Sequence, residues 1–430
     1  MRVLTLLFAS LLSFSAFAET IVFRNANVVS MTSPKVAEKQ SVVVVDGKIA
    51  SIVKASAPIP AGATVIDATG KYVMPGLADM HGHLPPPNSP AGLLDDIMFL
   101  YLANGATTLR VMNGYDGQTN IREYQKKGEV VAPNLYVAGP AMNAQTVKSV
   151  QDGIDKVKQQ KKQGWDLIKI QTGLTLEQYD AIAKTAKAEG MRFGGHIPES
   201  VSLLHAMEMG HETFDHLDGF VEYLNGEKGP IDPKKLAEVV KRSKDAGIWV
   251  VPTNALWNVF YNGVELDELR EYPELRYLPA GAVDSWTKLY NDRDAKLGES
   301  AQHVLENRVK ILNALYKGGV RILLGTDAPQ QFTVPGFSLH REIAEMKKAG
   351  MTNFDILKAG TVNAGLYFAK QDSFGTIEPG KRADLLLLGG NPLTDIANVD
   401  RIEGVMVRGR WFSRADLDAK LEKIEAKYPR

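Results

Sequence analysis

The chain has 430 residues, 44% of them hydrophobic and 23% charged, a composition that argues against disorder and allows a large buried core. Lys plus Arg and Asp plus Glu number 50 each, so no net charge would attract nucleic acid or an anionic membrane. The sequence contains no cysteine, which excludes disulfides, thiolate metal sites and cysteine nucleophiles. We therefore expect a small-molecule substrate that is recognised by local contacts.

Residues 1–18 have the pattern of a secretory signal peptide. Arg2 supplies the positive start, an apolar run follows over 3–14, and Ala16-Phe17-Ala18 forms a small-x-small cleavage site. The alternative is a single-span anchor, but the run is shorter than the roughly 20 residues that cross a bilayer. We predict cleavage after Ala18 and a bacterial, periplasmic protein that is free of the membrane after cleavage.

Both ends of the mature chain read as β-structure. Residues 19–71 contain three short β-rich runs, with Asp46-Gly47 as a hairpin signal, and residues 374–413 contain more strands separated by Pro-Gly and Arg-Gly turns. We predict one small β-sandwich domain that is built from both segments. Residues 414–430 should form a C-terminal helix.

The middle of the chain, residues 72–373, alternates apolar β-runs with amphipathic helical patterns. Eight such units in about 300 residues predict an α/β fold of the (β/α)8 TIM-like barrel type, with its active site at the carboxyl ends of the strands. The predicted strands lie within 72–83, 106–112, 134–140, 165–171, 192–197, 213–217, 248–253 and 320–327.

The segment 253–319 is far longer than a connection between strand and helix requires, so we expect extra helices over the mouth of the barrel. Trp257 and Tyr261 share a helix face there. They either pack on the barrel or roof an apolar part of the substrate. His340, at the start of a later helix, either faces the pocket as a substrate contact or is a helix-start histidine with no part in catalysis.

Histidines gather at the predicted strand ends. Of eight in the chain, His81, His83, His196 and His216 fall at the ends of the first, fifth and sixth strands. His81 and His83 are one residue apart and so point the same way. Convergence of four histidines at one rim indicates a metal site. His211, near the start of the sixth strand, is expected to be structural.

Lys169 and Asp327 complete the candidate site. Lys169 should point into the barrel, where burial and metal charge would lower its pKa and let the amine form a carbamate that bridges two metals. The alternative is a lysine that extends to the rim. Asp327 ends the eighth strand and would bind metal and accept a proton from water, whereas the alternative is a helix N-cap.

The motifs PGLADMHGH, LIKI, GGHIP, GHETFDHLDG, LLGTDAP and GTIEPGKRADLLLLGGNPL resemble those of the metal-dependent amidohydrolase superfamily, in the same order and over nearly the whole mature chain. The branch with imidazolonepropionase-like enzymes and Xaa-Pro dipeptidases is the most similar. The resemblance implies a binuclear metal site with a carboxylated lysine. Its ligands would be His81, His83, Lys169, His196, His216 and Asp327.

Two divalent metals held there would lower the pKa of a bridging water, and Asp327 would pass its proton to the leaving nitrogen. We favour Zn²⁺ from the nitrogen and oxygen ligands, with Mn²⁺, Fe²⁺ and Co²⁺ as alternatives. Arg110 departs from the family pattern, because Val111 follows it where an aspartate is common. Arg110 is either a ligand for a substrate carboxylate or a partner in an interior ion pair.

The leading hypothesis is therefore a hydrolase that uses a metal-bridging hydroxide to cleave an amide bond, in a dipeptide or an N-acyl amino acid. The same site could instead serve a lactonase, a carbamate hydrolase or a phosphotriesterase. A catalytically silent barrel that acts as a binding protein is the third hypothesis. A homo-oligomer is compatible with the sequence.

Overall fold

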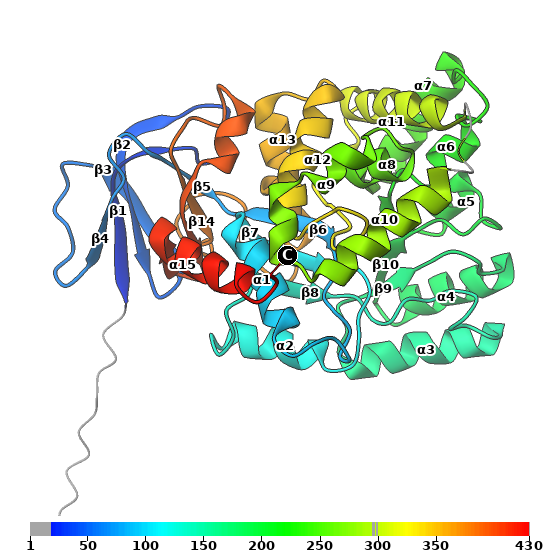
Figure 1. Ribbon diagram of the computed structural model, residues 1–430, viewed down its shortest axis with the longest axis horizontal. Coiled ribbons are helices and arrows are strands. Elements are labelled where there is room, and N and C mark those ends of the chain that lie inside the picture. Colours follow the sequence, from blue (N-terminus) through cyan, green and yellow to red (C-terminus); the bar gives the residue numbers. More distant parts are fainter. Residues whose placement is uncertain (1–18, 295–296, 298–299, 430) are drawn as a thin grey trace, which may run out of the picture.

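A computed structural model describes residues 19–294, 297 and 300–429, so the predicted signal peptide lies outside the described residues. Segments from both ends of the chain form a sheet at one end of the molecule, and the middle of the chain forms an α/β body beside it (Figure 1). None of the described helices is long and apolar enough to cross a membrane.

The α/β body is built on eight short parallel strands, one in each of the predicted runs. They form a three-stranded sheet of order β6-β7-β8 and a five-stranded sheet of order β13-β12-β11-β10-β9. Parallel bridges from Ala138 to Leu167 and from Gly82 to Ala328 link the edges of the two sheets. The strands are β6 (Leu77–Gly82), β7 (Ala106–Val111), β8 (Asn134–Val137), β9 (Leu167–Ile170), β10 (Arg192–Gly195), β11 (Thr213–Asp215), β12 (Trp249–Val251) and β13 (Arg321–Ile322).

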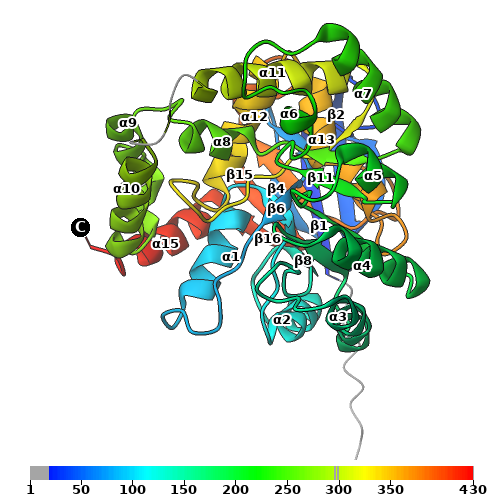
Figure 2. The ribbon, with the colours of Figure 1, turned by 90° about the vertical axis from the view of Figure 1, so that its right-hand side faces the viewer.

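Helices surround these strands, as the alternating pattern predicts (Figure 2). Those that follow the strands are α1 (Leu93–Ala103), α2 (Gln118–Lys126), α3 (Val150–Gln163), α4 (Leu176–Ala188), α5 (Leu203–Glu208), α6 (Phe220–Tyr223), α7 (Pro233–Ala246), α11 (Ser300–Lys317), α12 (Phe337–Lys348), α13 (Asn353–Gly360) and α14 (Val362–Tyr367).

Local sequence explains where such helices begin and end. At α7 the side chain of Asp232 accepts a hydrogen bond from the Lys234 amide, and Pro233 occupies the first helical position. Gly247 then ends the helix in the left-handed conformation, with φ of 65°. At α4, Thr175 and Gln178 form a reciprocal capping box.

The long excursion after β12 is helical, which confirms that part of the prediction. It contains α8 (Asn254–Phe260), α9 (Leu266–Arg270), the 3-10 helix η1 (Pro273–Tyr277) and α10 (Ala280–Asp294). The helix α8 follows the strand end directly and packs against α12 and α10. It is therefore placed to reach the carboxyl ends of the strands.

The two ends of the chain share one eight-stranded sheet. Its order is β16-β15-β14-β5-β1-β2-β3, with β4 beside β1. The predicted hairpin at Asp46-Gly47 is present, since both residues have positive φ and join two antiparallel strands. The strands are β1 (Thr20–Val28), β2 (Ala37–Val45), β3 (Lys48–Lys54), β4 (Thr64–Asp67), β5 (Tyr72–Pro75), β14 (Leu385–Leu388), β15 (Ile402–Val407) and β16 (Arg410–Ser413).

Antiparallel pairing of β5 with β14 joins the two terminal segments, so the sheet extends to Pro75. Two-layer packing of a sandwich stays a prediction. A 3-10 helix, η2 (Ile396–Asp400), precedes β15, and the C-terminal helix is α15 (Arg414–Glu425), shorter than the predicted 414–430. It packs against β15, β16 and α1.

Candidate metal centre

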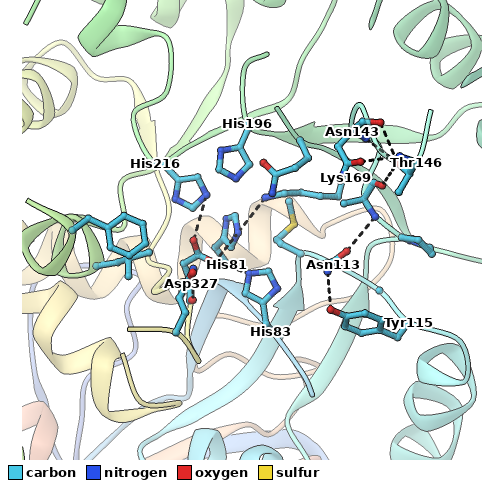
Figure 3. Close-up of a pocket in the computed structure, with 18 of the residues that line it drawn as sticks. His81, His83, Asn113, Tyr115, Asn143, Thr146, Lys169, His196, His216 and Asp327 are labelled. Atoms are coloured by element: carbon cyan, nitrogen blue, oxygen red, sulfur yellow. Dashed lines mark hydrogen bonds and ion pairs between the residues drawn. The ribbon is translucent and has the colours of Figure 1, made fainter. Parts of the chain in front are cut away.

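Strand ends bring the six predicted ligand residues to one cavity of about 670 Å³ (Figure 3). We call these six residues the rim cluster. His81 and Lys169 lie within β6 and β9, and the others lie just after β6, β10, β11 and β13. Parallel strands whose carboxyl ends meet explain this convergence of residues that are far apart in the sequence. The rim cluster consists of His81, His83, Lys169, His196, His216 and Asp327.

Asp327 lies at the centre of the contacts. Its Oδ1 is 2.5 Å from His83 Nε2 and 3.4 Å from His81 Nε2, and its Oδ2 is 3.6 Å from His216 Nε2. One ligand atom each from His81, His83 and Asp327 lie within 4.8 Å of one another. Such a group of nitrogen and oxygen donors could hold a divalent cation.

The remaining two members of the rim cluster, Lys169 and His196, lie beside His81 and His216. Lys169 Nζ lies 3.2 Å from His81 Nε2, and the rings of His196 and His216 have centroids 4.4 Å apart. Lys169 and His216 are each 1% exposed. The cluster therefore extends as one continuous group from Asp327 to Lys169 and His196, with His83 and His196 partly exposed.

Three of the histidines are oriented by a second polar side chain. The Nδ1 atom of His81 lies 2.8 Å from Asp215, that of His196 lies 2.6 Å from Asp218, and that of His216 lies 2.8 Å from Thr253. The contacts of His196 and His216 are hydrogen bonds that occupy Nδ1 and leave Nε2 available to a metal. The contact of His81 with Asp215 has ion-pair distance but not hydrogen-bond geometry. Metal-ligating histidines in proteins commonly have such a partner.

These orienting residues were not predicted from the sequence. Asp215 and Asp218 stand immediately before and two residues after His216 in the DHLD sequence. An acidic residue beside a predicted strand-end ligand was the available signal, because a histidine ligand needs a partner for its second nitrogen.

Burial keeps His81 and His216 neutral. Desolvation lowers the pKa of His81 and of His216 well below the ordinary value, and it also lowers the pKa of Lys169. Burial alone would raise the pKa of Asp327, but the neighbouring His81 and the hydrogen bond from His83 outweigh it and lower the pKa to about 2. The cavity thus presents the carboxylate of Asp327 and the neutral imidazoles of His81 and His216 at neutral pH.

One buried atom tests whether these residues fit a metal. His216 Nε2 has no hydrogen-bond partner among the described residues, although the atom is buried. A buried nitrogen without a partner is costly, and a cation would satisfy it. The donor set and this atom together fit a divalent metal.

Backbone strain marks the same strand ends. His216 and Asp327 have φ of 65° and 62°, and Thr253 has φ of 48°. Residues other than glycine rarely occupy this left-handed region, and they cluster at functional sites. Gly325 allows the close approach that brings Asp327 to His81, since a Cβ at Gly325 would lie 2.8 Å from the backbone nitrogen of His81.

The predicted substrate contacts divide into one that reaches the cavity and three that do not. Trp257 lines it together with Phe260. Tyr261 stacks on Trp257 at 5.6 Å between ring centroids but is not one of the lining residues of the described chain. Tyr261 therefore supports Trp257 rather than touching the cavity.

Arg110 and His340 are also away from the cavity. Arg110 is fully buried, donates to the Met80 carbonyl and forms an ion pair with Asp215 at 3.2 Å, the interior alternative in the sequence analysis. His340 contacts the Asn104 carbonyl at 3.1 Å and pairs with Asp400. Neither residue is among the described lining residues of the cavity, and substrate binding by Arg110 or His340 stays a prediction.

The cavity also has polar lining that the sequence analysis missed. These side chains come from loops directly after β7, β8, β9 and β13, so their position after strand ends was the usable signal. Polarity alone does not separate them from ordinary loop residues. They include Asn113, Tyr115, Asp116, Asn143, Thr146, Gln171 and Gln330.

The sequence model of the Amidohydrolase family matches residues 72–412. The chain belongs to this family. The match covers all six residues of the rim cluster, and the predicted membership of the metal-dependent amidohydrolases is confirmed at the level of the family.

Curated relatives align over a short stretch only. A dihydroorotase of Pelotomaculum thermopropionicum is 46% identical over 72 residues, and the aligned part is 16% of each protein. A dihydroorotase of Caldicellulosiruptor saccharolyticus is 42% identical over 67 residues. The chain therefore matches about one sixth of the length of these relatives.

Solved structures agree over almost the whole chain. Bottromycin amidohydrolase has a TM-score of 0.74 at 24% identity, with coverage of 95% of this chain and 90% of the other. A Xaa-Pro dipeptidase with bound methionine has a TM-score of 0.70 at 21% identity, with coverage of 92% and 100%. The amidohydrolase fold is thus shared with these enzymes.

Proposed function

We propose that this member of the amidohydrolase family is a binuclear metal-dependent hydrolase that cleaves an amide C–N bond. The observation that carries the proposal is the convergence of the rim cluster on Asp327, with three histidines fixed by Asp215, Asp218 and Thr253. Similar folds in a Xaa-Pro dipeptidase and in bottromycin amidohydrolase support it.

His81, His83, Lys169, His196, His216 and Asp327 would hold two divalent cations, with Zn²⁺ preferred for these donors and Mn²⁺, Fe²⁺ or Co²⁺ as alternatives. When bound, the cations would lower the pKa of a water and polarise a carbonyl. The lowered pKa of Lys169 favours the free amine, the form that can add carbon dioxide and lose a proton to give a carbamate.

The residues of the chain then handle the proton. Asp327 is ionised at neutral pH and lies at the centre of the cluster, so its carboxylate would accept a proton from the attacking water. The same carboxyl group would return this proton to the leaving nitrogen. Trp257 and Phe260 shield the cavity beside His216.

The architecture in this proposal is a closed (β/α)8 barrel over 72–373 with a β-sandwich from 19–71 and 374–413. The bridges between the edges of the two parallel sheets support closure. We also propose export through the signal peptide 1–18 to the periplasm. An N-terminal sequence of the exported protein that starts at Glu19 would agree, and retention of residues 1–18 would contradict it.

The test of function is the release of free amine by the metal-loaded mature protein. The substrate panel contains dipeptides, N-acyl amino acids and the carboxamide form of each. Release above that of a chelated sample is the expected result. Silence across the panel at confirmed metal content would overturn amide cleavage. Lactones, carbamates and phosphotriesters form the second panel, since the same residues could serve those reactions.

A further inference from the structure

The wall of the cavity beyond Lys169 presents hydrogen-bond donors with fixed orientation. We call Tyr115, Asn143 and Gln171 the donor wall. These residues follow β7, β8 and β9, and all three line the same cavity as the rim cluster. Figure 3 shows Tyr115 and Asn143 on the side of the cavity away from His216.

Backbone contacts fix the two amide side chains. Asn143 Oδ1 accepts hydrogen bonds from the amides of Gln145 and Thr146, both at 2.9 Å, and Gln171 Oε1 accepts one from the Thr172 amide at 3.1 Å. An amide oxygen held by backbone N–H groups identifies which end is the NH₂ group. Neither NH₂ group has a protein partner among the described residues, so both are available to a ligand.

The hydroxyl of Tyr115 is fixed by a similar chain of contacts. The Ala141 amide donates to Asn113 Oδ1 at 3.2 Å, which turns the Asn113 NH₂ group toward the Tyr115 oxygen at 3.1 Å. The tyrosine oxygen is therefore an acceptor for Asn113. Its own O–H hydrogen remains free to donate to a ligand.

Charge around this wall favours a neutral acceptor. The donors are uncharged, and the carboxylate of Asp116 lines the same cavity. A substrate carboxylate placed there would exchange its hydration for neutral donors, since Lys169 of the rim cluster is the one Lys or Arg among the described lining residues. The exposed Asp116 adds a repulsion that solvent screens. A carbonyl oxygen would gain the same hydrogen bonds without that repulsion, and Trp257 and Phe260 provide apolar surface for the rest of the substrate.

We propose that the donor wall binds neutral carbonyl oxygens, so that the enzyme prefers substrates with a carboxamide or acylated end over the same substrates with a free carboxylate. Asn143, Gln171 and Tyr115 are then specificity residues. This inference rests on the proposed amide cleavage and narrows its substrate class.

The matched pair phenylalanyl-proline and phenylalanyl-prolinamide tests it. Both release phenylalanine through the same scissile bond, and they differ only in the terminal carboxylate or carboxamide. We expect kcat/KM to be at least about tenfold higher for prolinamide. A higher kcat/KM for the free dipeptide would overturn the inference and leave the proposed function intact.

Variants distinguish the contribution of the donor wall to specificity from that of the Asp116 charge. Gln171→Glu should lower kcat/KM for the prolinamide substrate by about tenfold or more, since a donor becomes an acceptor. Asp116→Asn should raise kcat/KM for the free dipeptide severalfold. Asn120→Asp, on the exposed part of α2, is the matched control for Gln171→Glu, since it adds the same negative charge, and it should alter neither value.

Absence of turnover with both members and their N-acetyl analogues would count against amide cleavage. In that case the preference of the donor wall is tested by calorimetry, with phenylalanyl-proline and phenylalanyl-prolinamide each titrated into the metal-loaded protein. Tighter binding of the prolinamide supports the inference. Tighter binding of the free dipeptide, or equal binding that Gln171→Glu does not change, overturns it.

Discussion

His216 and His211 are five residues apart, and their comparison separates a candidate ligand from a packed side chain. Both are buried, and burial lowers the pKa of both, to about 4 for His211. In both, Nε2 has no hydrogen-bond partner in the part of the chain that the structure describes. An unpartnered imidazole nitrogen therefore does not mark a metal site by itself.

The difference lies in what surrounds each ring. His211, just before β11 begins, contacts the Tyr179 hydroxyl at 3.2 Å and packs among Phe193 and Phe214. His216, at the other end of the same strand, faces Asp327 and the ring of His81. The start of β11 thus lies in an apolar environment, and its end lies among candidate metal ligands.

The largest expected effect is at the centre of the rim cluster. Asp327→Asn should lower kcat by about 10²- to 10⁴-fold, because the amide cannot accept the proton, while metal content stays near that of the wild type. Steady-state kinetics with metal analysis of the same sample measure both. An unchanged kcat would remove Asp327 from proton transfer.

Substitution of each of the two histidines tests their predicted difference directly. His216→Ala should reduce bound metal per chain with little loss of thermal stability. His211→Ala should leave the metal content unchanged and lower the free energy of unfolding by roughly 2–4 kcal/mol, since a cavity replaces the ring. Metal analysis and chemical denaturation of both variants decide. Equal metal loss in the two would end the distinction.

Lys169 is the buried amine of the rim cluster, and its substitution should also reduce the bound metal. Lys169→Ala should lose about one metal per chain, and short carboxylic acids should partly restore it by taking the place of a carbamate. Activity and metal content measured with and without added acetate report the rescue. Full binuclear occupancy in Lys169→Ala would contradict a bridging role.

The orienting residues should have a smaller effect than the ligands. Asp215→Asn and Asp218→Asn keep the shape of the side chains but remove the charge beside His81 and His196. We expect metal affinity to fall by about 10- to 100-fold in each. Competition with a chelator dye measures the affinity. The exposed Asp155→Asn on α3 serves as control.

Glu342 provides the smallest effect, on the pH dependence of stability. Burial raises its pKa to about 8, and its carboxyl oxygen accepts a 2.7 Å hydrogen bond from the Ala255 amide of α8. The folded pKa exceeds the unfolded one, so the contribution to stability is complete below pH 4.5 and is lost as pH rises through 8.

Glu342→Gln keeps the acceptor and should remove this pH dependence. Relative to the variant, the wild type should lose up to about 1.4 kcal/mol of unfolding free energy for each pH unit in that window. Denaturation curves at several pH values measure the difference. Parallel curves for the two proteins would show that Glu342 does not titrate there.

Much of the fold follows from the sequence because its signals are local. Alternation of apolar runs with capped helices predicts all eight parallel strands, and the Asp46-Gly47 pair predicts its hairpin. The single sheet from both chain ends depends on the pairing of β5 with β14, a contact between distant segments. Local patterns cannot specify which segments pair or how many layers result.

The candidate site divides in the same way. His81, His83 and Asp327 were accessible from the sequence, since their position at strand ends and the resemblance both point to them. Arg110 was not, because whether a buried arginine meets a substrate or an interior Asp215 depends on tertiary contacts. The donor wall was missed for a related reason: fixed amide orientations arise from loop backbone contacts that no motif encodes.

The most direct test of the central claim is amine release by the chelator-stripped protein before and after stepwise addition of Zn²⁺, with bound metal measured at each step. The account predicts no release from the stripped protein and full activity as bound metal approaches two ions per chain, with Asp327→Asn inactive at the same metal content. Full activity without metal, or none at two bound ions on substrates of both panels, would contradict it.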